Sequence, residues 1–165
     1  MRKSLTYLSF IYIAIIFYSC QDNEQPRFRL VNPTESGINF NNTIKENDSV
    51  NVVDFLNVYN GGGVAVGDIN NDGMLDAYFS GNMVSGRLYL NKGNLKFDDI
   101  SNQSGIMDNR WGTGVTMVDI NQDGWLDIYV SVSGDLGNNK KANLRYINNH
   151  DLTFTESAAE YGLAD

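Results

Sequence analysis

A sixteen-residue segment occurs twice in this chain and constrains its fold more than any other feature. The sequence GVAVGDINNDGMLDAY at residues 63–78 returns 51 residues later as GVTMVDINQDGWLDIY at residues 114–129. A second element, LYLNKGNLKF at residues 88–97, is matched by RYINNHDLTF at residues 145–154. Sequence periods of ~20–50 residues are typical of propellers and other repeat arrays. We therefore expect two copies of one supersecondary unit.

Each copy is expected to form four short strands. Apolar runs at 64–66 and 115–118 precede an Asp-rich segment, and runs at 75–79 and 126–132 follow it. The third and fourth strands would flank a tight turn, NKGN or NNHD, which favours a hairpin. Four strands in ~50 residues is the spacing of a propeller blade. The sequence therefore predicts an all-β fold: a partial β-propeller of two four-stranded antiparallel blades.

The boundaries follow from the two copies, with the first repeat at 61–106 and the second at 107–165. Residues 28–31 and 36–38, FRLV and SGI, echo the end of each copy. We therefore expect an N-terminal closing strand within 28–38, followed by a polar connection up to residue 60, in which 50–56 suggests another strand. Two blades leave sheet faces uncovered. The rest of a larger propeller, or further copies of the chain, would be needed to close the fold.

The Asp-rich segment has the pattern Asp-x-Asn-x-Asp-Gly-x-x-Asp in both copies. Alternate residues of a tight loop direct oxygen atoms toward one centre, and glycine permits the sharp bend. Hard oxygen ligands favour Ca²⁺ over zinc, copper or iron. We expect two structural calcium sites. Their ligands would be Asp68, Asn70, Asp72, Met74 through its carbonyl, and Asp76, and equivalently Asp119, Asn121, Asp123, Trp125 through its carbonyl, and Asp127.

Two other interpretations of these loops were weighed. An EF-hand needs glutamate at position twelve, where this chain has Phe79 and Val130. The loops could also be hairpins with Asx turns and solvated carboxylates. Two matched loops in matched contexts favour the calcium interpretation.

The chain resembles FG-GAP/VCBS repeat proteins, whose blades are similar to those of the integrin α-subunit propeller and carry calcium in this loop. The segments YNGGGVAVGD at 59–68 and NKGNLKF at 91–97 resemble more narrowly the secreted cartilage-acidic-protein/UnbV group. The resemblance covers residues ~28–165 and implies the ten ligands named above. Members of this group usually hold more repeats, which implies that this chain is an N-terminal fragment of a longer protein.

The N-terminus has the features of an export signal. A basic start, Met1–Lys3, precedes an apolar run at 8–18 that is too short to span a membrane. The run ends at FYSC, residues 17–20, which resembles a lipobox. We expect a signal peptide at 1–19, a lipidated Cys20, and a tether at 20–27. A non-cleaved anchor or a plain secretory signal are the alternatives. The expected location is the cell envelope, as an outer-membrane lipoprotein facing the surface or the periplasm.

Composition excludes several classes of function. The formal net charge of −8 argues against nucleic acid, whose phosphates need Lys and Arg partners. One cysteine, Cys20, rules out a disulfide within the chain. No Gly-x-Ser-x-Gly or Ser-x-x-Lys motif is present, and Gly61–Gly63 lacks the Lys of a phosphate loop. His150 is expected to be a surface turn residue. No catalytic residue is predicted.

The leading interpretation is therefore a non-enzymatic binding or scaffolding module with a protein or glycan ligand. The alternative is the non-catalytic portion of a polysaccharide-processing or hydrolytic envelope protein. Residues 133–143, which hold the extra residues of the second repeat, are expected to be a variable contact loop. Trp111 and Trp125 are expected to pack in the core or between blades, although a loop-tip Trp111 could stack on a sugar.

Overall fold

The structure is a computed structural model that describes residues 27–133 and 142–163. The expected signal peptide, Cys20 and most of the contact loop at 133–143 lie outside the described residues. The chain divides into two units, residues 1–30 and 31–165. All of the named elements belong to the second unit. Within the described ranges, no helix is long and apolar enough to cross a membrane.

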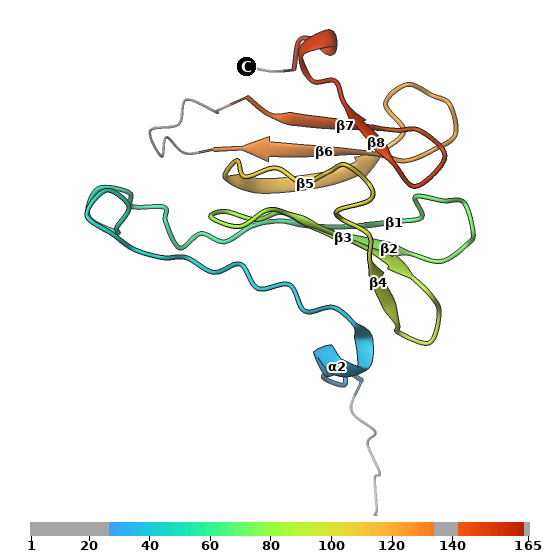
Figure 1. Cartoon of the computed structure of the whole chain (residues 1–165), viewed down its shortest axis with the longest axis horizontal. Coiled ribbons are helices and arrows are strands. Elements are labelled where there is room, and N and C mark those ends of the chain that lie inside the picture. Colours follow the sequence, from blue (N-terminus) through green and yellow to red (C-terminus); the bar gives the residue numbers. More distant parts are fainter. Residues whose placement is uncertain (1–26, 134–141, 164–165) are drawn as a thin grey trace, which may run out of the picture. The chain divides into compact units, whose positions relative to one another are not determined.

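The second unit contains two four-stranded antiparallel sheets, and almost no helix (Figure 1). The expected all-β fold with two four-stranded blades is confirmed. In each sheet the strands follow one another in chain order, as in a propeller blade. The first sheet contains β1 (Val64–Gly67), β2 (Asp76–Phe79), β3 (Arg87–Asn91) and β4 (Phe97–Asp99). The second contains β5 (Gly112–Val118), β6 (Asp127–Val132), β7 (Leu144–Asn148) and β8 (Phe154–Glu156).

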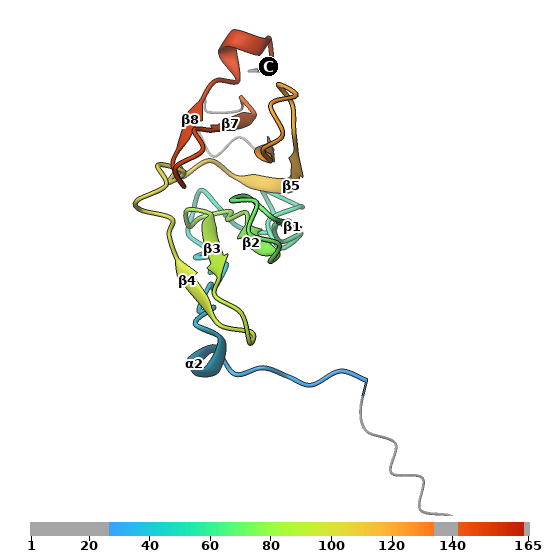
Figure 2. The ribbon, with the colours of Figure 1, turned by 90° about the vertical axis from the view of Figure 1, so that its right-hand side faces the viewer.

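The two sheets pack face to face around one hydrophobic core (Figure 2). In the first sheet Tyr78 lies opposite Leu88 in the register, and both side chains face the second sheet. In the second sheet Ile128 lies opposite Tyr146, and both enter the same core. Because strand side chains alternate between faces, each sheet buries alternate positions against the other.

The first strands of the two sheets, β1 and β5, approach closely because glycine lies at their contact. A Cβ atom on Gly63 would lie only 2.9 Å from the backbone nitrogen of Val115 and 3.0 Å from the Cα of Gly114. Any other side chain at position 63 would push the two strands apart. Gly63 therefore has a packing role, whereas a Cβ on Gly114 would meet Ser131 only at an ordinary contact distance of 3.8 Å.

The expected closing strand within residues 28–38 is wrong. The structure has a short helix, α2 (Pro33–Ser36), capped at its N-terminus by the side chain of Asn32 and at its C-terminus by Gly37 with φ of 81°. The sequence echo marks a repeated turn, since Gly105 and Gly162 also have positive φ. A strand is stable only beside a partner strand, and within the described ranges no strand pairing involves residues 28–31.

Residues 39–60 cover the face of the first sheet that is turned away from the second (Figure 1). The expected strand at 50–56 is also wrong, because this stretch forms turns and takes part only in an isolated bridge between Asn47 and Val50. Val50 and Val58 form a small second core with Trp111. Trp111 is thus a buried packing residue, as expected from the sequence.

Candidate metal centre

The two Asp-rich loops connect the first and second strands of their sheets, β1 to β2 and β5 to β6, and share one backbone conformation. Asn71 and Gly73 have φ of 58° and 84° in the first loop. Gln122 and Gly124 have φ of 61° and 87° at the same positions of the second. The left-handed region favours glycine, and a Cβ on Gly73 would meet no atom within 4 Å. Glycine is therefore needed here for its backbone conformation rather than for space.

The first aspartate of each loop accepts two backbone hydrogen bonds from the bend of the loop. Asp68 accepts from the nitrogens of Asp72 at 3.1 Å and Gly73 at 2.7 Å. Asp119 accepts from Asp123 at 3.0 Å and Gly124 at 2.9 Å. These bonds curl the backbone around the carboxylate, so the repeated sequence produces a repeated loop.

The middle positions of each loop also converge. The Asn70 amide donates to Asp72 Oδ2 at 2.9 Å, and the Asn121 amide donates to Asp123 Oδ2 at 2.7 Å. The other oxygen of Asp72 accepts from the nitrogen of Met74 at 2.8 Å. The carbonyl oxygens of Met74 and Trp125 accept no hydrogen bond from the described residues. The side chains of positions one, three and five thus gather in one small loop.

The last aspartate of each loop is fully buried and joins the loop to the hairpin beside it. Asp76 accepts from the nitrogens of Ile69 at 3.0 Å and Asn91 at 2.7 Å. Burial raises the pKa of the Asp76 carboxyl, the hydrogen bonds from Asn91 and Ile69 oppose this increase, and the charges of Asp72 and Asp68 add to it. Three carboxylates of one loop therefore lie within electrostatic range of one another.

Asp127 repeats this arrangement in the second sheet. Its carboxylate accepts from the nitrogens of Ile120 at 3.1 Å and Asn148 at 2.9 Å. Sequence reasoning placed both buried aspartates among the expected ligands but missed their second role. They fix each loop to the third strand of the same sheet.

Asn91 and Asn148 are structural residues of the site that sequence reasoning missed. The Asn91 amide donates to the Leu75 carbonyl at 2.8 Å. The Asn148 amide donates to the Leu126 carbonyl at 3.1 Å and also to the Ile69 carbonyl of the first repeat at 2.8 Å. The sequence did contain a signal for this role, since asparagine ends the third strand in both copies. Asn148 therefore joins the second repeat to the loop of the first.

The second loop differs from the first through His150. Its Nε2 lies 2.9 Å from Asp123 Oδ2, and its ring stacks on Trp125 with 4.8 Å between ring centroids and an interplanar angle of 20°. The hydrogen bond from His150 lowers the pKa of the Asp123 carboxyl, and the one from the Trp125 nitrogen lowers it further. His150 is an exposed turn residue, as expected, but one that contacts the loop. The equivalent residue in the first repeat is Gly93.

The residues of both loops fit calcium by their chemistry, since every expected donor is an oxygen. Oxygens of Asp68, Asp72 and Asp76 accept backbone hydrogen bonds, and those of Asp119, Asp123 and Asp127 do the same. Within the described ranges, no three His, Cys, Asp or Glu side chains are grouped closely enough to hold a metal ion. Calcium binding would therefore require carboxylates to turn from these amides toward the ion.

Two sheets of four sequential strands, each with an Asp-rich loop between its first two strands, define a β-propeller-like repeat module. Residues 68–130, from the first loop through most of β6, match the model of the FG-GAP-like repeat. A stretch of 75 residues is 40% identical to cartilage acidic protein 1 of Xenopus tropicalis. That stretch is 44% of this chain and 12% of the relative. These matches support the expected resemblance to the FG-GAP repeat group. The chain spans only a small part of that relative's length.

Proposed function

We propose that this chain is a calcium-stabilised binding or scaffolding module of a cell-envelope lipoprotein. The observation that carries the proposal is the internal duplicate: both loops have the same donor residues, the same left-handed positions and the same hydrogen bonds. The repeated sequence accounts for the shared conformation, and the retention of every oxygen ligand in both copies is what favours a common ion. Calcium, when bound, would supply positive charge that offsets the three carboxylates of each loop and would favour the folded state.

Each proposed site takes its ligands from one loop. In the first repeat, Asp68, Asn70 and Asp72 would supply side-chain oxygens, Met74 its carbonyl, and Asp76 an oxygen from the buried side. Asp119, Asn121, Asp123, Trp125 and Asp127 would do the same in the second. Since extracellular calcium modules commonly bind at ~10⁻⁴–10⁻³ M, these sites would be filled outside the cell and empty inside it.

Terbium luminescence tests the second site, with a variant of the first loop as the control. Tb³⁺ is a hard cation that takes oxygen ligands and emits when a nearby tryptophan is excited. Trp125 lies in the second loop, whereas the chain's other tryptophan, Trp111, is buried in the small core with Val50 and Val58. We expect emission that calcium displaces and that Asp123→Ala abolishes, while Asp72→Ala leaves it intact. Absence of emission from the wild-type chain would contradict the second site.

The proposed function is binding rather than catalysis. The aspartates that could suggest a pair of catalytic carboxylates are assigned to the calcium loops, and His150 is engaged with Asp123 and Trp125. Among the described residues of the two repeats we find no nucleophile beside a general base, as hydrolytic catalysis would need. Incubation with ester and glycoside substrates should therefore give no turnover above that of a heat-denatured sample.

The proposed location rests on the N-terminal sequence. Lipidation of Cys20 would anchor the module to the outer membrane through a short tether. Mass spectrometry of the N-terminus should show loss of residues 1–19 and a lipid on Cys20. With Cys20→Ser, the protein should leave the membrane fraction. Retention in the membrane by the serine variant would favour a non-cleaved anchor.

A further inference from the structure

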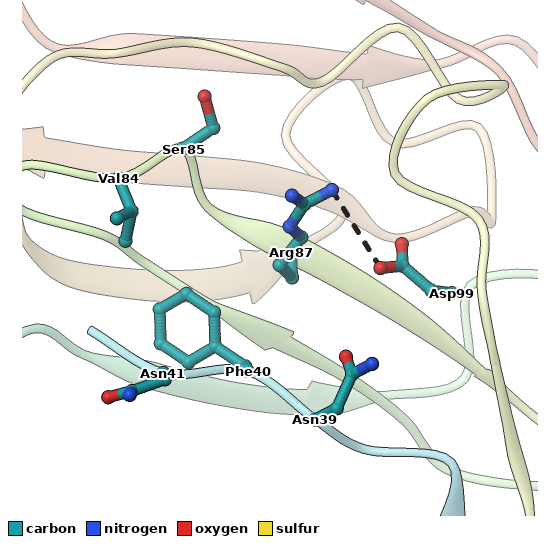
Figure 3. Close-up of a pocket in the computed structure, with 7 residues that line it drawn as sticks. All are labelled: Asn39, Phe40, Asn41, Val84, Ser85, Arg87 and Asp99. Atoms are coloured by element: carbon teal, nitrogen blue, oxygen red, sulfur yellow. Dashed lines mark ion pairs between the residues drawn. The ribbon is translucent and has the colours of Figure 1, made fainter. Parts of the chain in front are cut away.

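A cavity of about 340 Å³ lies on the first sheet, at the end opposite its Asp loop (Figure 3). In an antiparallel sheet the β2–β3 connection and the β1–β2 loop are at opposite ends, and this cavity includes residues of the β2–β3 connection. Its volume is at the lower end of the range for small-molecule sites. The lining combines one aromatic ring with polar and charged groups: Asn39, Phe40, Asn41, Val84, Ser85, Arg87 and Asp99.

The two walls of the cavity are held together by a pair of hydrogen-bonded amides, Asn42 and Asn82. Asn82 accepts a hydrogen bond from the Asn42 side chain, and its backbone nitrogen donates to Asn42 Oδ1 at 2.9 Å. The Asn82 amide also donates to the carbonyls of Gly61 at 3.2 Å and Gly112 at 2.9 Å. Asn82 is completely buried. The segment 39–42 is thus fixed against the β2–β3 connection.

Aromatic packing fixes the floor of the cavity. Phe40 stacks on Phe79 with 5.4 Å between centroids, and Phe79 packs edge-on against Tyr89 at 5.7 Å. The Tyr89 hydroxyl donates to Asn39 Oδ1 at 3.1 Å. Phe40 and Asn39 are therefore held in position by the strands of the first sheet. A preformed site of this kind avoids the cost of ordering its side chains when a ligand binds.

The polar groups of the lining keep part of their hydrogen-bonding capacity. Asp99 Oδ1 accepts from the backbone nitrogen and the hydroxyl of Ser101, and Arg87 Nη1 donates to Met107 Sδ at 3.7 Å, which leaves Asp99 Oδ2 and the other guanidinium N–H groups for a ligand. Arg87 Nη1 lies 3.8 Å from Asp99 Oδ2, which is longer than a charge-assisted hydrogen bond of ~2.8 Å. Both side chains are about a third exposed, at 34% and 35%. The Ser85 hydroxyl makes no hydrogen bond within the described part of the chain. Figure 3 shows Arg87 directed toward Asp99 above Asn39, with the Phe40 ring on the other side of Asn39 from Asp99.

We propose that this cavity binds one pyranose unit of a neutral glycan. The apolar C–H face of a pyranose would pack on Phe40, and neighbouring hydroxyls would donate to Asp99 and accept from Arg87. The Asn39 amide nitrogen can donate to a further hydroxyl. This assigns a ligand class to the binding role proposed above and rests on that role, but it requires no calcium at the Asp loops.

Charge favours a neutral sugar over an acidic one. Arg87 and Asp99 together contribute no net charge to the cavity. The chain as a whole has a formal net charge of −8, which repels uronates and other anionic sugars. An acidic sugar would also have to compete with Asp99 for the guanidinium. The polar lining is therefore suited to hydroxyl pairs rather than carboxylates.

Saturation-transfer NMR on the full chain tests this proposal, in a detergent without a sugar headgroup. The probes are the methyl pyranosides of glucose, galactose, mannose and N-acetylglucosamine, with glucuronic acid as the charged comparison. We expect transfer to at least one neutral pyranoside, strongest at its ring C–H protons, and none to glucuronic acid. The signal should be the same with calcium and with a chelator under which the chain remains folded.

Three variants locate the binding. Arg87→Gln and Asp99→Asn should each weaken binding at least tenfold, whereas Asp98→Asn should leave it unchanged. Asp98 is the matched control, because it is the neighbouring exposed carboxylate on β4 and alternation places it on the other face of the sheet. Thermal melts should show all three variants folded.

Absence of transfer to every neutral pyranoside would overturn the proposal, whatever the terbium result. Binding that survives Arg87→Gln and Asp99→Asn, or a preference for glucuronic acid, would also overturn it. Conversely, pyranoside binding without terbium emission would support this site and contradict only the second calcium site. The two proposals therefore fail separately.

Discussion

Alanine at position 127 should destabilise the chain far more than alanine at position 123, although both aspartates are proposed ligands of one ion. Asp127 is completely buried, and its carboxylate accepts hydrogen bonds from the nitrogens of Ile120 and Asn148. Asp123 is exposed, its bonds to the Trp125 nitrogen and the Asn121 amide stay within the loop, and its one bond outside the loop is to the exposed ring of His150. Comparing the two alanine variants therefore distinguishes the structural role of Asp127 from the ligand role that both aspartates are proposed to have.

The magnitudes follow from the bonds that are lost. A hydrogen bond to a charged group contributes about 1.5–3 kcal/mol, so the two bonds of Asp127 are worth about 3–6 kcal/mol. Removal of a buried carboxylate relieves part of its desolvation cost, and we expect a net loss of about 3 kcal/mol. For the exposed Asp123 we expect about 1 kcal/mol or less. At about 3–4 °C per kcal/mol, Tm should fall by about 10 °C for Asp127→Ala and by less than about 4 °C for Asp123→Ala.

Circular dichroism melts in chelator measure the loss of stability of each variant, and melts in calcium then measure the increase in Tm that the ion gives. At about ten times a Kd of ~10⁻³ M, one filled site adds about 1.4 kcal/mol. Both variants should lose the increment of the second site and keep that of the first. Equal destabilisation in chelator would refute the anchoring role of Asp127, and an undiminished calcium shift would refute its role as a ligand. Asp76→Ala and Asp72→Ala form the matched pair in the first repeat.

Three further substitutions test other contacts. Asn148→Ala should lower the free energy of unfolding, measured with urea, by about 1 kcal/mol more than Asn91→Ala, because only Asn148 also bonds to the first repeat; equal losses would contradict this. His150→Gly, which installs the residue of the first repeat, should cost under about 1 kcal/mol but reduce the near-ultraviolet dichroism of Trp125; an unchanged spectrum would contradict the stacking. Arg145→Leu should raise Tm, as argued below.

The internal duplication of the sequence made most of the fold predictable. Two copies of the same pattern defined the eight strands and both Asp loops, and the structure agrees with the strands to within a few residues. Local pattern was sufficient because each blade is built from neighbours in sequence, with short connections between antiparallel strands. The closing strand was not predictable in the same way. Residues 28–31 repeat the sequence of a strand, but a strand also needs a partner.

The parts of the sites that depend on distant segments were not predictable. The carboxylates of the loops could be expected from their spacing, whereas the bond between Asn148 and Ile69 joins residues 79 positions apart. The cavity on the first sheet brings together Asn39, Arg87 and Asp99, which share no motif. Burial of Trp111 likewise depends on residues 50–58, which fold back over it. A single sequence does not specify such contacts.

The two repeats differ in physical character at Arg145 of the second. Leu88 has the equivalent position on β3 and packs against the second sheet. Arg145, on β7, is completely buried, and its three guanidinium nitrogens have no hydrogen-bond partner among the residues that the structure describes. The Tyr161 ring covers it, with its centroid 3.1 Å from Cζ. Replacing a buried, incompletely paired charge by an apolar residue of similar volume stabilises some proteins by about 1–4 kcal/mol.

Arg145→Leu should therefore raise the free energy of unfolding by about 1–3 kcal/mol, since the hydrophobic gain and the relief of desolvation exceed the lost cation–π contact. Urea unfolding of the full chain measures the change. Tyr161→Ala is the control: it uncovers Arg145, removes the same contact and should destabilise. A loss of stability in Arg145→Leu comparable to that in Tyr161→Ala would show that the stacked pair is itself stabilising. In that case the outer face of the second sheet would be held by Arg145 rather than weakened by it.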